Sequence, residues 1–448
     1  MKKYILLILF LFICTFGLVK VEAKSYDLYE QIKSKAVLDN QASDFVSSST
    51  GINFLEIASD TNGKGVYIIS DTKDDEYPIY YYRGNIDNNH IAYAGFCWQM
   101  VRTTEKGGIK LLYTGKLSEN GTCDATGNDL MVDKVSYGLS NGEIYLGYMY
   151  ALDGEEPNSN SSIIKEATDN WFKENMLDYI NDLEDSLFCN DRSKTNDDFN
   201  TVLRLKEGKP TLSCANLDDS FSVNEDIGNG KLTYPVGIIN SDEVTYGGGL
   251  LKGTSLETYL FVGASYWAMS PYSVTKILYP NSKGMLNMNT IEYSTGVRPM
   301  IVLKNGAIYH GGDGTKESPY NIVDKPFYDI LTDDDSVADK VDAQAGESIT
   351  ITVNEKDGYN IKGLLFYDSS DKEISINYET NVAGVYLFEM PNEEVRIKAV
   401  YEEIVLEKDE NKEEVKNPET GNFVTLYIIM AVISFTFLYY LVKKFKNV

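Results

Sequence analysis

Uncharged apolar runs stand at both ends of the chain, and shorter apolar stretches alternate with polar residues between them. At the beginning, a basic start precedes an apolar run over residues 4–19 and a small-residue site at Ala23. This order is typical of an export signal. The pattern therefore predicts a signal peptide over residues 1–23, cleaved between Ala23 and Lys24.

The second apolar run covers residues 423–442 without a charge. At about 1.5 Å per residue it is long enough for a hydrocarbon core of roughly 30 Å. The lysines of residues 443–448 follow at once, as expected at a cytoplasmic end. We therefore predict a transmembrane helix over residues 423–442 and a basic cytoplasmic tail over 443–448.

Residues 24–75 predict one helix followed by short strands. Near-helical spacing of apolar residues indicates the helix, and β-branched and aromatic stretches indicate the strands. The positions that carry the helix are Leu28, Ile32 and Val37, and the strands are expected at residues 66–69 and 79–82.

Residues 76–323 predict a larger α+β domain. An apolar strand up to Arg102, a Gly-Gly turn at 107–108 and a return strand over 109–113 form an expected β-hairpin. A helix is expected over 161–185, capped by Ser161 or Ser162, because apolar residues recur there at helical spacing. Further strands are expected at residues 234–239, around 266–271 and at 297–303.

Residues 326–402 alternate apolar and polar positions more regularly, as in half-buried strands. Turn residues separate the stretches 349–353, 361–367 and 395–401. We expect a small all-β module here, followed by a charged, solvated linker over residues 403–416.

The charge balance excludes one class of partner. The chain has 41 basic and 67 acidic residues, a formal net charge of −26. Without residues 1–23 and 421–448, which hold six lysines and one glutamate, 35 basic and 66 acidic residues remain, a net charge of −31. Nucleic-acid affinity depends largely on basic residues at phosphates, so we expect no nucleic-acid partner.

Four of the five cysteines follow the signal peptide: Cys97, Cys123, Cys189 and Cys214. An even number in an exported chain indicates disulfides, with three possible connectivities. We choose Cys97–Cys123 and Cys189–Cys214, because each closes a loop of about 25 residues, worth about 3 kcal/mol in the chain-entropy model. Free thiols and a zinc site are the alternatives, although no Cys-x-x-Cys pair is present.

Few residues point to catalysis, and we expect neither an enzyme nor a cofactor. His90 and Cys97 lie in one predicted hairpin, but a disulfide-bonded Cys97 and a turn at His90 is the preferred interpretation. No Gly-x-Ser-x-Gly, His-Glu-x-x-His or phosphate-binding loop is present. The acidic residues 333–335 and Asp339 lack the spacing of a calcium loop, so a solvated turn is preferred and no metal is expected.

The end of the chain resembles a known signal. Asn417-Pro418-Glu419-Thr420-Gly421, the apolar run and the basic tail together resemble the cell-wall sorting signal of Gram-positive surface proteins, the substrates of sortases. The resemblance implies that a sortase attacks the Thr420 carbonyl, releases Gly421 onward, and transfers the chain to an amino group of peptidoglycan. The usual first residue is Leu rather than Asn417, which leaves the sortase class open.

Two further resemblances concern the folded part. Gly-Phe-Cys-Trp at 95–98, Tyr-Trp-Ala-Met-Ser-Pro at 266–271 and Val-Arg-Pro at 297–299 resemble an uncharacterised family of bacterial surface domains over residues 76–323. Their Trp-x-x-Ser-Pro and Val-Arg-Pro elements are similar to the C-type-lectin-like fold of formylglycine-generating enzymes. Gly-Tyr at 358–359 and Phe-x-Met-Pro at 388–391 resemble a divergent internalin-type B-repeat.

The lectin-like resemblance implies a candidate ligand platform at Tyr266 and Trp267, where aromatic rings would stack on a sugar. The alternative, which we prefer, is that both rings belong to the core. Arg298 is expected to pair with a buried carboxylate or carbonyl.

Together these patterns predict an α+β protein with a disulfide-tied large domain and a small all-β repeat module. We expect it to be exported to the surface of a Gram-positive bacterium, joined to peptidoglycan through Thr420 after a transient membrane stage. The expected activity is binding of a glycan or protein ligand, as in an adhesin. A secreted hydrolase, a minor or tip pilus subunit, and an unprocessed single-pass membrane protein are the alternatives.

Overall fold

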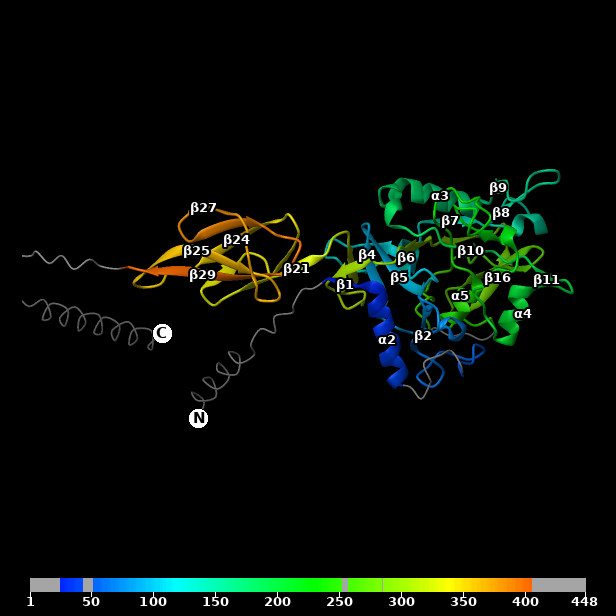
Figure 1. Ribbon diagram of the computed structural model, residues 1–448. Helices are drawn as coiled ribbons and strands as arrows, with labels where there is room; N and C mark the ends of the chain where they lie inside the picture. Colours follow the sequence, from blue (N-terminus) through cyan, green and yellow to red (C-terminus); the bar gives the residue numbers. More distant parts are fainter. Residues whose placement is uncertain (1–24, 43–50, 252–256, 284, 405–448) are drawn as a thin grey trace, which may run out of the picture. The chain divides into compact units, whose positions relative to one another are not determined.

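The computed structural model describes residues 25–42, 51–251, 257–283 and 285–404 (Figure 1). The predicted signal peptide with its cleavage site, the sorting motif over 417–421, the membrane span and the basic tail lie outside these residues, as does all but the beginning of the charged linker. Within the described ranges, no helix is long and apolar enough to cross a membrane. The described chain is mostly β with few helices, which agrees with the α+β class.

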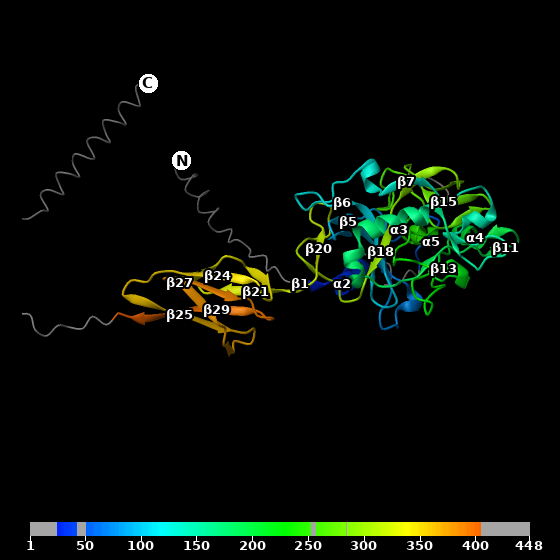
Figure 2. The same cartoon turned by 90° about the horizontal axis from the view of Figure 1, so that it is seen from above.

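A nine-stranded sheet is the framework of the part before residue 324 (Figure 2). Its strand order is β1-β19-β20-β4-β5-β3-β2, and β6 joins β5 to β18. All neighbours are antiparallel except β20 and β4. The strands are β1 Ser25–Asp27, β2 Gly65–Ile68, β3 Tyr80–Arg83, β4 His90–Tyr93, β5 Phe96–Thr103, β6 Ile109–Lys116, β18 Met300–Leu303, β19 Ile308–His310 and β20 Tyr320–Val323.

The β4–β5 and β5–β6 hairpins form the centre of the sheet, and the turn of each has the backbone geometry that its sequence predicts. Gly107 adopts φ +80° between β5 and β6, as the Gly-Gly turn predicts. Ala94 and Gly95 adopt φ +53° and +77° between β4 and β5, the geometry of a two-residue hairpin loop. Every residue of β5 is buried, so this strand has no solvent-facing side.

The helices are short and pack against the sheets. The expected helix over 161–185 is wrong in length, because Met176 leaves helical geometry with φ −125° and ψ 0° and a 3₁₀ turn follows. Two helices were not expected from the sequence. The helices are α2 Leu28–Ala42, α3 Ile163–Asn175, α4 Asn200–Glu207 and α5 Ser241–Tyr246, and the 3₁₀ turns are η1 Ser70–Thr72, η2 Gly127–Leu130, η3 Glu143–Leu146, η4 Leu177–Asp182 and η5 Leu217–Asp219.

Small sheets and irregular segments complete this part. The expected strand over 234–239 is wrong, because only Gly237 forms a bridge, to Met300. The expected strand over 297–303 is two strands, since Pro299 lacks the N–H that an uninterrupted ladder needs. The pairs are β10 Phe188–Cys189 with β13 Ser220–Phe221, β11 Lys194–Thr195 with β12 Asp198–Phe199, β17 Ser294–Val297 with β7 Asp133–Ser136, β8 Met149–Tyr150 with β9 Asn160–Ser161, and the three strands β14 Pro271–Ser273, β15 Lys276–Pro280 and β16 Leu286–Thr290.

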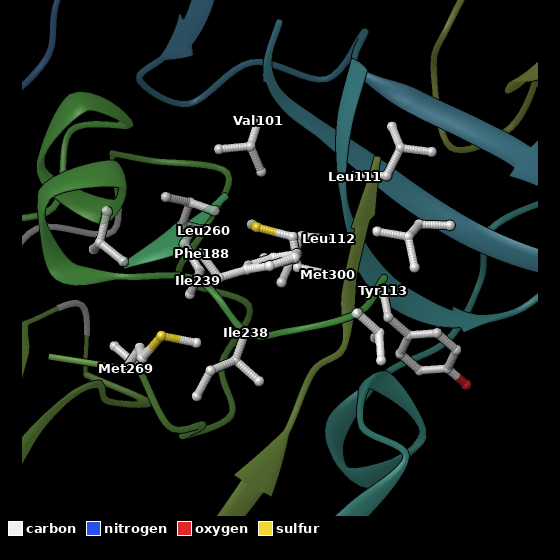
Figure 3. Close-up of a cluster of buried hydrophobic side chains, with 14 of the residues drawn as sticks. Val101, Leu111, Leu112, Tyr113, Phe188, Ile238, Ile239, Leu260, Met269 and Met300 are labelled. Carbon is white, nitrogen blue, oxygen red and sulfur yellow. The ribbon is translucent and has the colours of Figure 1, made fainter. Parts of the chain in front are cut away.

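The main core lies between the β5–β6–β18 strands and the irregular segment around residue 238 (Figure 3). Leu112 and Met300 extend from β6 and β18 toward Ile238 and Phe188, and all four side chains are buried. Trp171 of α3 contacts the rings of Phe96, Trp98 and Tyr113. The irregular segments are thus placed by burial of their apolar side chains rather than by strand pairing.

Residues 327–403 form two sheets, with orders β23-β21-β29-β25-β26 and β22-β24-β28-β27. Ile349, Ile351 and Val353 are buried in turn, as the alternating sequence predicts. Only strands and turns occur in this described range. They are β21 Phe327–Thr332, β22 Ser336–Ala338, β23 Asp342–Gln344, β24 Ser348–Val353, β25 Tyr359–Tyr367, β26 Glu373–Ile374, β27 Tyr378–Val382, β28 Val385–Glu389 and β29 Val395–Glu403.

Contacts divide the described residues into two compact units, those before 355 together with 363–400, and residues 355–362 with 401–404. In the described residues of the second unit, the Lys356 ammonium lies over the rings of Tyr359 and Tyr401, 5.1 and 5.3 Å from their centroids. These cation–π contacts stabilise that unit locally.

Replacing Ser162 by Ala is expected to lower the free energy of unfolding by about 1–2 kcal/mol. The Ser162 hydroxyl caps α3 by accepting from the Lys165 N–H and donates to the Tyr148 carbonyl at 2.7 Å. Urea unfolding followed by tryptophan fluorescence measures the change. The matched variant is Ser161→Ala, which is expected to change stability by less than about 0.5 kcal/mol, and equal effects of the two would contradict the capping role.

Candidate functional site

The structure contains the sequence-local pair of disulfides, Cys97–Cys123 and Cys189–Cys214. Cys97 is therefore not available as a nucleophile. His90 is the first residue of β4, opposite Gln99, and not in a turn as expected. Burial lowers the pKa of His90, so the imidazole is neutral and structural at ordinary pH.

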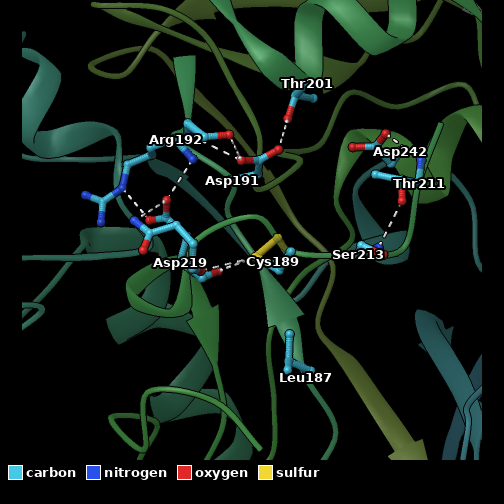
Figure 4. Close-up of a disulfide and its surroundings, with 12 residues drawn as sticks. Leu187, Cys189, Asp191, Arg192, Thr201, Thr211, Ser213, Asp219 and Asp242 are labelled. Carbon is cyan, nitrogen blue, oxygen red and sulfur yellow. Dashed lines mark hydrogen bonds and ion pairs between the residues drawn. A yellow bond between two sulfur atoms is a disulfide. The ribbon is translucent and has the colours of Figure 1, made fainter. Parts of the chain in front are cut away.

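Charged side chains surround the second disulfide (Figure 4). The Arg192 Nε donates to Asp219 Oδ1 at 2.6 Å, and Arg204 Nη2 lies 2.7 Å from Asp191 Oδ2 and 2.8 Å from Asp242 Oδ2. Asp191, Asp219 and Asp242 are all buried, so each carboxylate needs these partners. This network holds the irregular chain on both sides of Cys189 and provides no unpaired acid for chemistry.

The candidate platform at Tyr266 and Trp267 is wrong as a ligand surface. Their side chains are 0% and 1% exposed, and a stacking platform requires an open ring face. The Tyr266 hydroxyl donates to the Leu260 carbonyl, and Trp267 Nε1 donates to the Val135 carbonyl at 3.0 Å. Both residues are core residues whose polar atoms are satisfied internally.

Arg298 is a buried structural residue that contacts Tyr266. Its Nε donates to the Tyr113 carbonyl at 2.7 Å, its Nη2 donates to Gln99 Oε1 at 2.9 Å, and its guanidinium lies over the Tyr266 ring. The expectation of a carbonyl partner is confirmed, and burial lowers the pKa of Arg298.

The acidic segment around residue 333 has structural partners. Asp333 accepts from the Ser336 hydroxyl and the Ala399 N–H, and Asp339 accepts from the Thr350 N–H. Among the described residues, no group of three His, Cys, Asp or Glu side chains is placed to hold a metal ion.

A groove of about 760 Å³ is the strongest candidate for a ligand site. Three connections form it: the β4–β5 turn, the 3₁₀ turn η4, and the β18–β19 turn, together with the end of β20. This volume falls within the roughly 300–1,000 Å³ of small-molecule sites. The lining residues used below are Tyr93, Asp178, Tyr179, Asn181, Asp182, Lys304 and Asp324.

Contacts fix the polar and aromatic side chains of this groove. The Tyr93 hydroxyl donates to Asp182 Oδ2 at 3.1 Å, and the Tyr93 and Tyr179 rings meet edge to face with centroids 5.5 Å apart. Burial and the nearby charge of Asp182 raise the pKa of Tyr93, so its hydroxyl stays protonated as a donor. Tyr179 is 37% exposed.

The backbone of η4 is tied to the sheet edge. Leu183 bridges Leu303, and the Lys304 N–H donates to the Asp182 carbonyl at 2.9 Å. The Lys304 ammonium donates to the Asn181 carbonyl at 2.5 Å. Tyr179 and Asp182 are therefore held by a rigid scaffold although they lie in a connection.

Sequence reasoning did not single out these groove residues. The sequence pattern predicts a helix that continues through Tyr179, and carboxylates are too numerous in this chain to mark Asp182. The available signal was a tyrosine flanked by Asp178 and Asp182.

A buried charge cluster lies elsewhere in the same part. Glu243 Oε1 accepts from Arg102 Nε at 2.9 Å and from Lys110 Nζ at 2.8 Å. Burial alone raises the pKa of Glu243, but Lys110 and Arg102 outweigh it and lower this pKa to about 2. Burial lowers the pKa of Lys110 to about 8 against the attraction of Glu243. Each charge is paired, so the cluster is a structural one.

Comparisons with protein-family models, with curated proteins and with solved structures find no match for this chain. The terminal sequence patterns and the geometry above are therefore the indications of function.

Replacing Glu243 by Gln is expected to lower the free energy of unfolding by about 3–5 kcal/mol at neutral pH, because it leaves a buried cation uncompensated. The folded pKa of Glu243 is below its ordinary value, so the wild-type contribution is complete above about pH 4.5 and is lost as pH falls toward about 2. Urea unfolding across this pH range measures the difference in the free energy of unfolding between wild type and Glu243→Gln.

The matched variant is Glu105→Gln, at an exposed glutamate near the same strands, which is expected to behave as wild type. A gap between wild type and Glu243→Gln that stays constant down to pH 2 would contradict the assigned pKa direction.

Proposed function

We propose that this protein is exported, joined to the cell wall of a Gram-positive bacterium through Thr420, and displayed there as a ligand-binding surface protein. The ordered arrangement of pentapeptide, apolar run and basic tail carries the localisation. Two disulfides are expected of an oxidising, extracellular setting and support the export of the chain.

The groove at Tyr179 carries the binding part of the proposal. An exposed aromatic ring beside solvent-facing polar groups is the composition expected of a recognition site. Binding needs no general base or nucleophile, and the described cysteines are all bonded. We assign this groove as the ligand site of the displayed protein.

The finer fold assignments belong to the same proposal. Residues 76–323 would be a C-type-lectin-like surface domain, for which the mixture of short strands, irregular segments and two disulfides is the support. Residues 326–402 would be a B-repeat-like spacer, for which the two small sheets are the support.

Muramidase digestion of cell walls, followed by mass spectrometry of the C-terminal peptide, tests the anchoring. The peptide is expected to end at Thr420 and to carry a peptidoglycan-derived amine. Thr420→Ala is expected to keep the tail through Val448 in the membrane fraction, because it removes the side chain of the residue whose main-chain carbonyl the sortase would attack. The matched variant Glu419→Ala, at the variable position of the motif, is expected to be processed normally.

Other results would replace the proposal. An intact wild-type tail in the membrane fraction would make the protein a single-pass membrane protein. A Thr420 carbonyl joined to a lysine of another protein subunit would make it a pilus component.

A further inference from the structure

We infer that the groove beside Tyr179 binds an uncharged oligosaccharide. This inference deepens the proposed binding function and depends on it, since it names the ligand class of the same groove. Three properties of the lining carry it: an exposed ring, a mixture of hydrogen-bond donors and acceptors, and a surplus of negative charge.

The exposed ring provides an apolar surface of limited size. Tyr179 is held edge to face against the buried Tyr93, so its orientation is set before a ligand arrives. A sugar ring has one face rich in C–H groups, and an aromatic face buries it from water with little loss of side-chain entropy.

The polar groups around the Tyr179 ring include both hydrogen-bond donors and hydrogen-bond acceptors, and the hydroxyl groups of a sugar can bond to both. The carboxylates of Asp178, Asp182 and Asp324 only accept, whereas the Lys304 ammonium only donates. Among the described residues, Tyr93 is the one hydrogen-bond donor to the Asp182 carboxylate, through Oδ2, which leaves Oδ1 for a ligand hydroxyl. Hydroxyl groups both donate and accept, so a sugar can use the whole lining.

The charge of the groove lining narrows the class of ligand further. Three carboxylates and one ammonium line the groove, and the mature chain is strongly acidic. Sialylated or sulfated glycans would be repelled by this field. A basic peptide would be attracted by the carboxylates, but the Lys304 ammonium lies in the same lining and the exposed ring would be left without a matching apolar face. The lining therefore favours a neutral sugar.

The test uses the full-length chain in a zwitterionic detergent, applied to an array of uncharged, sialylated and sulfated oligosaccharides and of oligolysine. Retention on uncharged hexose and N-acetylhexosamine oligosaccharides is expected. It is expected to persist when salt rises from about 0.1 M to about 1 M, where the Debye length falls from about 10 to about 3 Å.

Two variants in the groove and one outside it locate the binding. Tyr179→Ala is expected to weaken retention about tenfold or more, and Asp182→Asn, which keeps the shape of the side chain, several-fold. The control Tyr293→Ala removes a ring that is 45% exposed and also meets another ring edge on, outside the groove. It is expected to bind as wild type.

Retention only on sialylated or sulfated sugars, salt-sensitive retention on oligolysine, or no retention on uncharged sugars would each overturn the inference. So would equal binding by the Tyr179→Ala and Tyr293→Ala variants. If Tyr179→Ala does not fold, as judged by circular dichroism, Asp182→Asn decides the question. The anchoring experiment is independent, so a failure here and a failure of the cell-wall assignment are distinguishable.

Discussion

The structure depends on placing one buried carboxylate between two buried cations. Arg102 of β5 and Lys110 of β6 are both buried, and both reach Glu243 of α5. The same residue completes the start of its helix, because its N–H donates to the Asn240 side chain and its Oε2 accepts from the Asn240 N–H. Glu243 thus joins a local helix cap to a contact that spans more than a hundred residues, and this fixes α5 on the central strands.

The region between residues 187 and 245 follows the same principle with less regular structure. Its strands are two residues long, so backbone ladders contribute little order. Arg204 bridges Asp191 and Asp242, and Cys189 is bonded to Cys214. Charge-assisted bonds and a covalent link therefore replace the ladder as the source of a defined conformation, and apolar residues such as Ile238 complete the packing.

The sequence predicted what depends on neighbours along the chain. The hairpin around Gly107, the capped helix after Ser162 and the alternating strand at Ile349 follow from turn chemistry, capping and periodicity, and the structure contains all three. The end of α3 at Met176 did not follow, because no glycine or proline marks it. The burial of Trp267 follows from its residue type and was the preferred prediction. The pairing of Glu243 with Lys110 joins residues more than a hundred positions apart, which no local pattern indicates.

The proposed groove shows why a candidate ligand site of this kind is difficult to predict from sequence. Tyr179 and Asp182 are ordinary surface residue types, and their value comes from what holds them. The Leu183–Leu303 bridge fixes η4 to the sheet, and the Tyr93 hydroxyl orients the Asp182 carboxylate from a strand end. A site fixed in this way pays little ordering entropy on binding. If the groove is the ligand site that we propose, the strongly acidic chain around it would disfavour anionic ligands, and shape and hydrogen bonding would discriminate among neutral ones.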